Sequence, residues 1–300
     1  MPKLGSIRLR HDPAWAVRAH GWPLLCPFRI SERALAWAID LPRAGARVVQ
    51  VQWTGRSRVL SIWVDGGVLG KEEEHLLRQK VGWMFRADER FEEFWGLCEH
   101  DKKLRECSRR RMGALIRSPD IFEDVVKTMC TVNCHWRNTQ KMVEKLCVLF
   151  GKSYENVGSL DGKQWTFPSV QSLAGASERG LKKAGLGFRA AWVSKFARSV
   201  VDERIDLDAW SCEQDVACLR ASLLGVVGLG SYSANHMLML LGHYAFVPCD
   251  SEVCSYLGFP PKTQAAVLER TVQKRYRRWG KYAFLAYKFE RVLAAYCADS

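Results

Sequence analysis

The chain has 300 residues, 48% of them hydrophobic, which is enough for one large domain or two modest domains with their own cores. No apolar run is long enough to cross a membrane, and the first residues lack the apolar segment of a secretory signal, so we expect neither a membrane protein nor a secreted one. The net charge of +13 favours a polyanionic partner, nucleic acid first, although a basic surface that only aids solubility gives the same composition.

Lysine and arginine recur along the whole chain and are densest at 102–111 and 273–282. Acidic residues are interspersed with them, which indicates a folded basic protein rather than a disordered arm. The eleven cysteines are odd in number and fall mostly in helical patterns, which indicates reduced thiols. We therefore expect a cytoplasmic protein, associated with the nucleoid if the source is bacterial. We also expect a monomer.

The N-terminal part of the chain has the pattern of an antiparallel sheet with a helix. Residues 45–66 alternate between apolar and polar, which predicts two strands joined at 54–55. Alternate residues lie on one face of each strand. These are Val49, Val51 and Trp53 in the first strand, and Val59, Ser61 and Trp63 in the second. From 72 to about 100 the apolar spacing becomes helical.

After residue 111 the sequence is almost entirely helical, in pieces separated by Gly and Pro. The expected helices lie within 118–133, 139–151, 167–175, 177–187, 189–201, 211–225, 263–278 and 281–297. The predicted fold is mainly α with an N-terminal α+β domain. An antiparallel-sheet domain over 1–104 would precede a helical domain over 105–300, made of two helical subdomains.

One stretch of the helical part, 213–241, has a pattern with a chemical use, because it predicts a helix, a short turn and a second helix. Gly228 and Gly230 lie on either side of Leu229, and glycine permits positive φ and close approach of another backbone. The N–H groups at the start of the second helix, around Ser231 and Ser233, can hold a phosphate. Such a turn would grip DNA without reading its bases, although a tight interhelical turn without a ligand has the same glycine spacing.

Asp250 follows Gly230 by twenty residues, just beyond the second helix. An acid here can simply cap a helix that begins at Ser251. A hairpin and an acid at this separation are more specific than either alone, so Asp250 is the candidate catalytic carboxylate.

The segment GLGSYSANHMLMLLG…VPCD resembles the helix-hairpin-helix signature of DNA glycosylases, which ends in their catalytic aspartate. The segments 118–147, 167–175, 185–193 and 279–287 extend the resemblance over most of 105–295, and its closest form is the 8-oxoguanine DNA glycosylase branch. The resemblance implies an enzyme that swings a modified base out of double-stranded DNA and breaks its N-glycosidic bond. Asp250 would stabilise the charge that develops on the sugar and orient or deprotonate the nucleophile.

By the same resemblance, Asn133 fills the gap that the extruded base leaves, and Phe188 with Arg189 wedges near the opposite base. From the residues alone, Asn133 would be interpreted as a helix C-cap and Phe188 as a buried aromatic. Gly185 and Gly187 favour an exposed loop at Phe188.

The chain departs from the 8-oxoguanine branch where that branch has a nucleophilic lysine, two residues after the second hairpin glycine. Tyr232 occupies this position. No Schiff base can form there, so we expect a monofunctional glycosylase that leaves an abasic site without strand cleavage. Lys195 is interpreted as a surface residue, and lyase chemistry by another amine stays an alternative.

The base pocket departs as well. Tyr287 replaces a Gln that reads the purine edge, Arg291 an aromatic, His236 a small residue, and Glu252 a His. Each change alone could be neutral drift, but together they replace a flat purine slot by hydrogen-bonding and charged groups. They suit a bulky hydroxylated base such as glucosylated hydroxymethylcytosine of phage DNA, which would make the enzyme part of anti-phage defence. The alternatives are repair of an oxidised or alkylated purine, and a relative that binds DNA without catalysis.

We expect no required cofactor. Iron–sulfur members of the superfamily need four closely spaced cysteines, and only Cys254 and Cys297 lie beyond the catalytic acid, so no cluster is predicted. Cys130 and Cys134 beside His135 lack a second ligand pair, so core thiols are expected rather than zinc ligands. The resemblance implies a structural K+ or Na+ held by the backbone carbonyls of Leu224, Val226 and Leu229.

Overall fold

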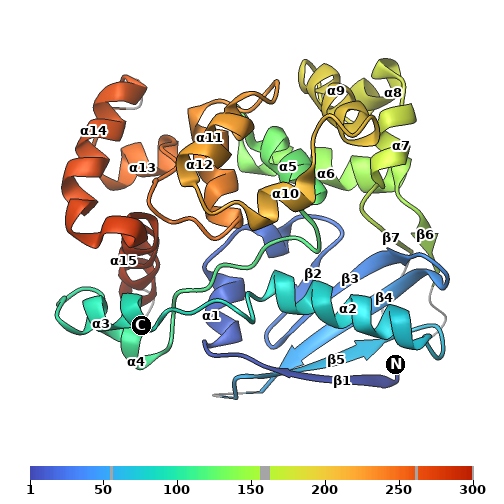
Figure 1. Cartoon of the computed structure of the whole chain (residues 1–300), viewed down its shortest axis with the longest axis horizontal. Coiled ribbons are helices and arrows are strands. Elements are labelled where there is room, and N and C mark those ends of the chain that lie inside the picture. Colours follow the sequence, from blue (N-terminus) through green and yellow to red (C-terminus); the bar gives the residue numbers. More distant parts are fainter. Residues whose placement is uncertain (55–56, 156–162, 261–262, 299–300) are drawn as a thin grey trace. The chain divides into compact units, whose positions relative to one another are not determined.

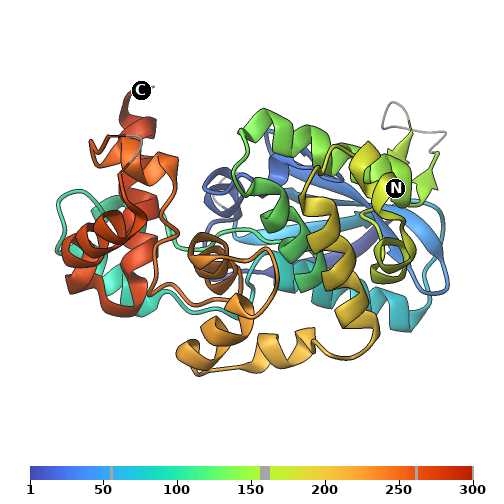
Figure 2. The same cartoon turned by 90° about the horizontal axis from the view of Figure 1, so that it is seen from above.

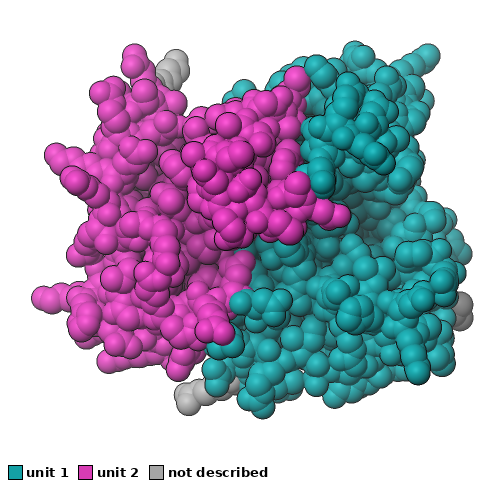
Figure 3. Space-filling view, viewed as in Figure 1, with its two compact units in different colours: residues 1–88, 115–207 teal, residues 89–114, 208–300 magenta. Residues whose placement is uncertain are grey.

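The computed structural model describes residues 1–54, 57–155, 163–260 and 263–298, and Figures 1 and 2 show the chain from two directions. It forms two compact units, coloured separately in Figure 3. Unit 1 contains residues 1–88 and 115–207, and unit 2 contains residues 89–114 and 208–300. Because the units interleave along the chain, they do not test the single division predicted between residues 104 and 105.

Unit 1 contains a five-stranded antiparallel sheet with the strand order β1-β5-β4-β3-β2. The strands are β1 (Lys3–Arg8), β2 (Arg29–Ser31), β3 (Ala34–Leu41), β4 (Gly45–Trp53) and β5 (Val59–Val64). The predicted strand pair is confirmed as β4 and β5, with Val49 opposite Val64 and Trp53 opposite Leu60. Residues 55–56 of the predicted turn lie outside the described residues.

Helix α2 (Lys71–Met84) packs on the sheet, and the two form one hydrophobic core. Its Leu77 and Val81 are fully buried, as are Trp37 of β3 and Val51 of β4 in the same cluster. The apolar stripe predicted within 72–100 is therefore the face of α2 that packs on the strands. This burial of aromatic and branched side chains is the main stabilising contribution in unit 1.

The remaining elements of unit 1 are mostly helical, and those from α5 onward form the green to yellow part of Figure 2. They are α1 (Pro13–Arg18), η1 (Trp22–Leu24), α5 (Ile121–Thr131), α6 (Trp136–Phe150), β6 (Ser153–Tyr154), β7 (Gln164–Trp165), α7 (Val170–Gly175), α8 (Glu178–Lys183) and α9 (Arg189–Val201). Helix α5 begins where Oδ1 of Asp120 accepts a hydrogen bond from Glu123 N at 3.0 Å.

Helix α5 also carries a buried ion pair. Lys127 Nζ lies 2.6 Å from Glu123 Oε1, and the two side chains are 0% and 5% exposed. The ammonium lies 4.3 Å from the ring centroid of Phe28. Burial raises the pKa of the Glu123 carboxyl to about 7, although the charge of Lys127 acts in the opposite direction.

The regular elements of unit 2, within its described residues, are all helices. Its elements are α3 (Glu92–Glu99), α4 (Arg105–Arg109), α10 (Leu207–Cys212, beginning at the last residue of unit 1), α11 (Val216–Leu224), α12 (Ser231–Leu240), α13 (Ser251–Tyr256), α14 (Ala265–Tyr276), η2 (Arg277–Tyr282) and α15 (Ala283–Ala298). Phe94 of α3 contacts Trp279, Tyr282 and Phe289, with ring centroids 5.6 to 6.3 Å apart. The predicted fold, an N-terminal antiparallel sheet followed by a mainly helical region, is confirmed.

Candidate functional site

The predicted hairpin consists of α11, a turn over 225–230 and α12. Gly228 has φ 95°, so this position needs a glycine, whereas Gly230 is extended, with φ −87°, directly before α12. Leu229 closes the turn by donating its N–H to Val226 O at 3.0 Å, and its side chain is buried. The sequence therefore placed the turn correctly, but only the first glycine is required by backbone conformation.

Arg220 joins the two helices of the hairpin. Its guanidinium donates from Nε to Asn235 Oδ1 at 3.0 Å and from Nη2 to Ser231 Oγ at 3.2 Å. Ser231 Oγ donates in turn to Glu269 Oε1 at 2.8 Å, and Ser233 is only 2% exposed. Both serine side chains are thus engaged within the protein or buried, so phosphate contacts at this turn would come chiefly from backbone N–H groups.

Asp250 lies at the N-terminus of α13, where the helix-cap interpretation is realised. Its Oδ1 accepts a hydrogen bond from Val253 N at 2.9 Å, which fixes the carboxylate. The residue is half-buried. Burial raises the pKa of the Asp250 carboxyl, and so does the charge of Glu252, whereas the Val253 N–H and the Arg291 guanidinium lower it.

Helix α15 presents two of the predicted pocket residues to the start of α13. Arg291 Nη1 lies 2.5 Å from Glu252 Oε2 and 3.3 Å from the hydroxyl oxygen of Tyr287. The Tyr287 side chain is buried, and its ring contacts that of Tyr256 edge-on, with centroids 5.9 Å apart. Burial raises the pKa of Tyr287 to about 12, so its hydroxyl is a neutral donor and acceptor at physiological pH. The structure therefore brings Glu252, Tyr287 and Arg291 together near Asp250.

His236 and Tyr232 lie on the same face of α12, with ring centroids 6.0 Å apart. His236 is 9% exposed, and burial, aided by the charge of Lys288, lowers its pKa to about 3. The imidazole is therefore neutral at physiological pH and can take part in hydrogen bonding but not in charge pairing.

Lys288 was missed by the sequence analysis. It is half-buried on α15, beside Tyr287 and one turn before Arg291, and no ion pair or hydrogen bond of its ammonium occurs among the described residues. Burial lowers its pKa to about 8, and Arg291 acts in the same direction, whereas the charges of Glu252 and Asp250 oppose the shift. Its place between two residues already assigned to the pocket was the only signal that the sequence offered.

The residues predicted to fill the gap and wedge the DNA belong to unit 1 and lie together. Asn133 is exposed and has φ 47°, just after α5, as a helix-terminating Asn does. Phe188 is 54% exposed and follows Gly187, which has φ 57°, so the predicted exposed loop is present. Arg189 is buried; it donates from Nε to Val132 O at 3.1 Å and from Nη2 to Asn133 O at 3.2 Å. Arg189 therefore supports the turn that carries Asn133.

The cation and metal predictions concern backbone carbonyls and cysteines. Val226 O accepts the Leu229 N–H, and a carbonyl oxygen retains a second lone pair, so the turn over 224–229 is compatible with a K+ or Na+. Cys130 is buried, whereas Cys134 is half-buried. Within the described ranges, no cluster of three or more His, Cys, Asp or Glu side chains is arranged to hold a metal ion. No helix of that part of the chain is long and apolar enough to span a membrane.

Comparison with known proteins identifies relatives in sequence and in structure. The chain is 26% identical over 208 residues to the N-glycosylase/DNA lyase OGG1 of Arabidopsis thaliana; the match covers 64% of this chain and 55% of the relative, so it spans about half the length of that protein. No protein-family model matches the chain.

Two solved structures share the fold over almost their whole length. A 3-methyladenine DNA-glycosylase from Archaeoglobus fulgidus superimposes with a TM-score of 0.72 at 21% identity, over 96% of this chain and 98% of that one. The 8-oxoguanine glycosylase/lyase of Clostridium acetobutylicum, in complex with double-stranded DNA, superimposes with a TM-score of 0.65 at 15% identity, over 92% and 99%. The chain therefore has the fold of these two DNA glycosylases, and part of its sequence is similar to the Arabidopsis thaliana protein.

Proposed function

We propose that this protein is a DNA N-glycosylase whose catalytic carboxylate is Asp250. The observation that carries the proposal is the position of Asp250, fixed at the start of α13 directly after a hairpin with a positive-φ glycine. The shared fold with DNA glycosylases supports it. We also propose that the protein acts as a monomer on double-stranded DNA in the cytoplasm, where its net charge of +13 favours binding to phosphates.

In the proposed reaction the C1′–N bond of an extruded nucleotide breaks, and its electron pair leaves with the base. The sugar becomes positively charged, and the Asp250 carboxylate stabilises it. A water molecule bonds to C1′ and gives its proton to that carboxylate, while the base takes a proton from solvent. The N–H of Val253 holds Oδ1 at the start of α13, and we propose that the carboxylate, fixed in this way, turns its second oxygen toward the sugar and the water.

We propose a monofunctional enzyme, because Tyr232 offers no amine at the second position after Gly230. Lys288 supports a second candidate, a glycosylase/lyase, since an amine with a pKa of about 8 is partly neutral and therefore nucleophilic near pH 8. Borohydride reduction in the presence of DNA with an abasic site distinguishes the two. The monofunctional proposal predicts no covalent adduct, and an adduct that Lys288→Gln abolishes would establish the lyase.

For the substrate, we propose a base with polar substituents, such as a glucosylated hydroxymethylcytosine of phage DNA, and hence a role in anti-phage defence. The support is the set of polar groups near Asp250, namely the Glu252–Arg291 ion pair and the Tyr287 hydroxyl. The neutral His236 of α12, whose pKa responds to Lys288 of α15, is a further polar group that we assign to the pocket. Repair of oxidised or alkylated purines is the alternative, and it is favoured by the names of the two solved structures that share the fold, a 3-methyladenine DNA-glycosylase and an 8-oxoguanine glycosylase/lyase.

The test is release of a free base. The protein is incubated with duplexes that each carry one modified base, and with phage DNA containing hypermodified cytosines; freed bases are identified by mass spectrometry, and abasic sites are cut with alkali. Release of a modified cytosine supports the proposed substrate, and release of an oxidised or alkylated purine supports the repair alternative. Duplex binding without release of any base would refute the enzyme and favour a non-catalytic relative.

A further inference from the structure

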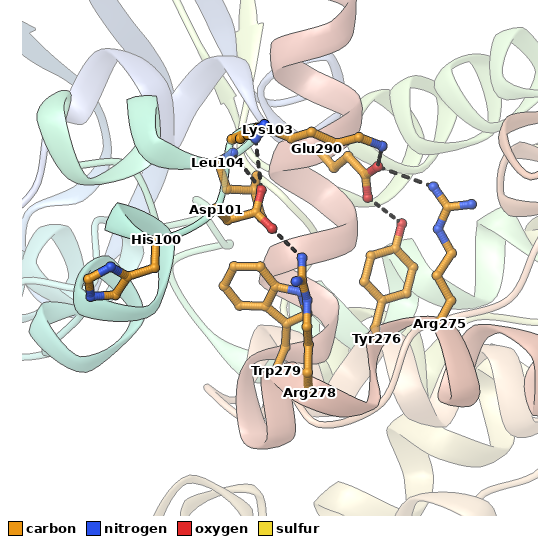
Figure 4. A pocket seen from close by; sticks show the side chains of 10 residues that line it. His100, Asp101, Lys103, Leu104, Arg275, Tyr276, Arg278, Trp279 and Glu290 are labelled. Atoms are coloured by element: carbon orange, nitrogen blue, oxygen red, sulfur yellow. Dashed lines mark hydrogen bonds and ion pairs between the residues drawn. The ribbon is translucent and has the colours of Figure 1, made fainter.

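Unit 2 contains a hollow of about 500 Å³ that the proposed reaction does not use (Figure 4). It brings together the two basic segments that the sequence singled out, 102–111 and 273–282, at the ends of α3 and α14. Its lining residues are His100, Asp101, Lys102, Lys103, Leu104, Arg275, Tyr276, Arg278, Trp279 and Glu290.

The two carboxylates of the hollow lie beneath its cations. Glu290 is 10% exposed and forms ion pairs with Lys103 Nζ at 2.6 Å and Arg275 Nη2 at 3.1 Å. Asp101 is 11% exposed and pairs with Arg278. The cations are more exposed than the acids: 67% for Lys103, 43% for Arg275 and 70% for Arg278. The positive groups therefore face solvent, and the negative groups are covered by them.

The buried carboxylates are themselves fixed. Asp101 Oδ1 accepts hydrogen bonds from Lys103 N at 2.8 Å and Leu104 N at 3.1 Å, and Glu290 Oε2 accepts one from the Tyr276 hydroxyl at 2.8 Å. Figure 4 shows these groups converging on the two acids. The three paired cations, Lys103, Arg275 and Arg278, are thus held in place before any ligand arrives, which lowers the entropic cost of binding to them.

The charge of the hollow exceeds what its own acids neutralise. Lys102 is exposed and makes no ion pair among the described residues, so four cationic side chains stand against two carboxylates. The guanidinium of Arg278 lies 5.3 Å from the ring centroid of Trp279 and retains further N–H donors beyond those that Asp101 occupies. Forked N–H donors and lysine ammonium groups are the groups that bind phosphate in proteins.

We propose that this hollow is a phosphate-binding site distinct from the Asp250 site, with Lys102 and Arg278 as its principal ligands. The phosphate could belong to the backbone of bound DNA or to a free phosphate compound; both have the same chemistry, and the experiment separates them. The proposal does not depend on glycosylase activity.

The test compares two double variants that each remove two exposed positive charges. Lys102→Gln/Arg278→Gln alters the hollow, and Lys71→Gln/Arg204→Gln is the control. Arg204, like Arg278, is an exposed arginine paired with an aspartate, although its partner Asp202 is 54% exposed where Asp101 is 11% exposed. Pyrophosphate is titrated by calorimetry at constant ionic strength, and short and long duplexes are titrated at several salt concentrations. Thermal melting confirms that each variant is folded, and Lys102→Glu, which breaks no ion pair, provides a second test of the hollow.

Pyrophosphate affinity should fall by about tenfold or more in the hollow variant and stay at the wild-type value in the control. If the phosphate is that of DNA, affinity for the long duplex should also fall, and the slope of log K against log salt should decrease by about one for each lost contact relative to the control. A loss of pyrophosphate binding without a change in duplex binding identifies a free phosphate compound. Hollow variants that match the control with both ligands overturn the proposal.

Discussion

Replacing Asp250 by asparagine separates the two contributions of this side chain. Asparagine keeps an oxygen that can accept the hydrogen bond from Val253 N, now 2.9 Å from Oδ1, but it has no negative charge. Since Asn and Asp cap helices equally well, α13 should be retained and the free energy of unfolding should change little. Asp250→Ala removes the cap as well and should lower that free energy by about 1 kcal/mol.

The effect of Asp250→Asn on the reaction should be far larger than its effect on stability. The carboxylate is half-buried and its pKa is raised by burial, so water screens its charge less than that of a surface acid. A positioned group that stabilises charge or accepts a proton typically contributes about 10²–10⁴-fold to the rate. Base release should therefore slow by at least about 10²-fold in this variant. Duplex binding should persist, because the substitution removes a negative charge.

Single-turnover base release, duplex affinity and denaturant unfolding, measured on the same preparations, check this prediction. Asp120→Asn is a matched control, because Asp120 caps α5 with the same i to i+3 geometry, Oδ1 to Glu123 N at 3.0 Å. The control should change neither the rate nor the affinity. Wild-type base release by Asp250→Asn would show that the charge of Asp250 does not act in the reaction, and the proposed mechanism would be wrong.

Three further predictions concern the wedge, the buried ion pair and pH. Phe188→Ala should slow base release yet change the free energy of unfolding by no more than about 0.5 kcal/mol, because the ring is 54% exposed; an unchanged rate would remove the wedge role. The folded-state pKa of Glu123, about 7, lies above its ordinary 4.5, so the folded state favours the protonated carboxyl. The free energy of unfolding should therefore be highest, as far as Glu123 contributes, below pH 4.5, and should fall as pH rises toward 7. Denaturation across that range should show this loss in the wild type but not in Glu123→Gln. Because the pKa of Asp250 is raised, the rate should fall on acidification with a midpoint above 3.8, and a lower midpoint in the pH–rate profile would contradict the assigned role.

The sequence predicted the elements whose local pattern is strong, and missed those shaped by their surroundings. Strands β4 and β5 were found by alternation, but β3 was not, because seven of its eight residues are buried and it shows no alternation. The helical pattern from 72 to 100 is two helices, since α2 ends at Met84 and Arg86 has φ 53°. Nothing local in the sequence marks that break.

Face assignment in β5 shows a similar limit. The sequence analysis placed Val59 and Trp63 on one face of β5, and these side chains are half-buried. The buried face carries Leu60, Ile62 and Val64. Both faces contain large apolar side chains, so alternation alone could not decide which one faces α2.

At the candidate site, a short motif was enough to locate the hairpin turn and the helix that Asp250 caps. The motif could not show that Arg189 is buried against the carbonyls of Val132 and Asn133, because an arginine after an exposed aromatic looks like a surface residue. Lys288 was missed because a lysine in a helix is normally expected at the surface. Its environment depends on charges from α13 and α15 that are far apart in the sequence.

Two of the departures from the 8-oxoguanine branch are one structural unit. Glu252 and Arg291, which the sequence presents as separate changes, form an ion pair of 2.5 Å, and Arg291 also donates to Tyr287. Either residue alone would place an uncompensated charge near Asp250: Glu252 raises the carboxyl pKa, and Arg291 lowers it. Present together, they act on the Asp250 pKa in opposite directions, and they leave positioned N–H donors and a carboxylate beside it. Independent drift at the two positions is therefore a poorer explanation than a joint change, and a base recognised here must share Arg291 with Glu252 and Tyr287.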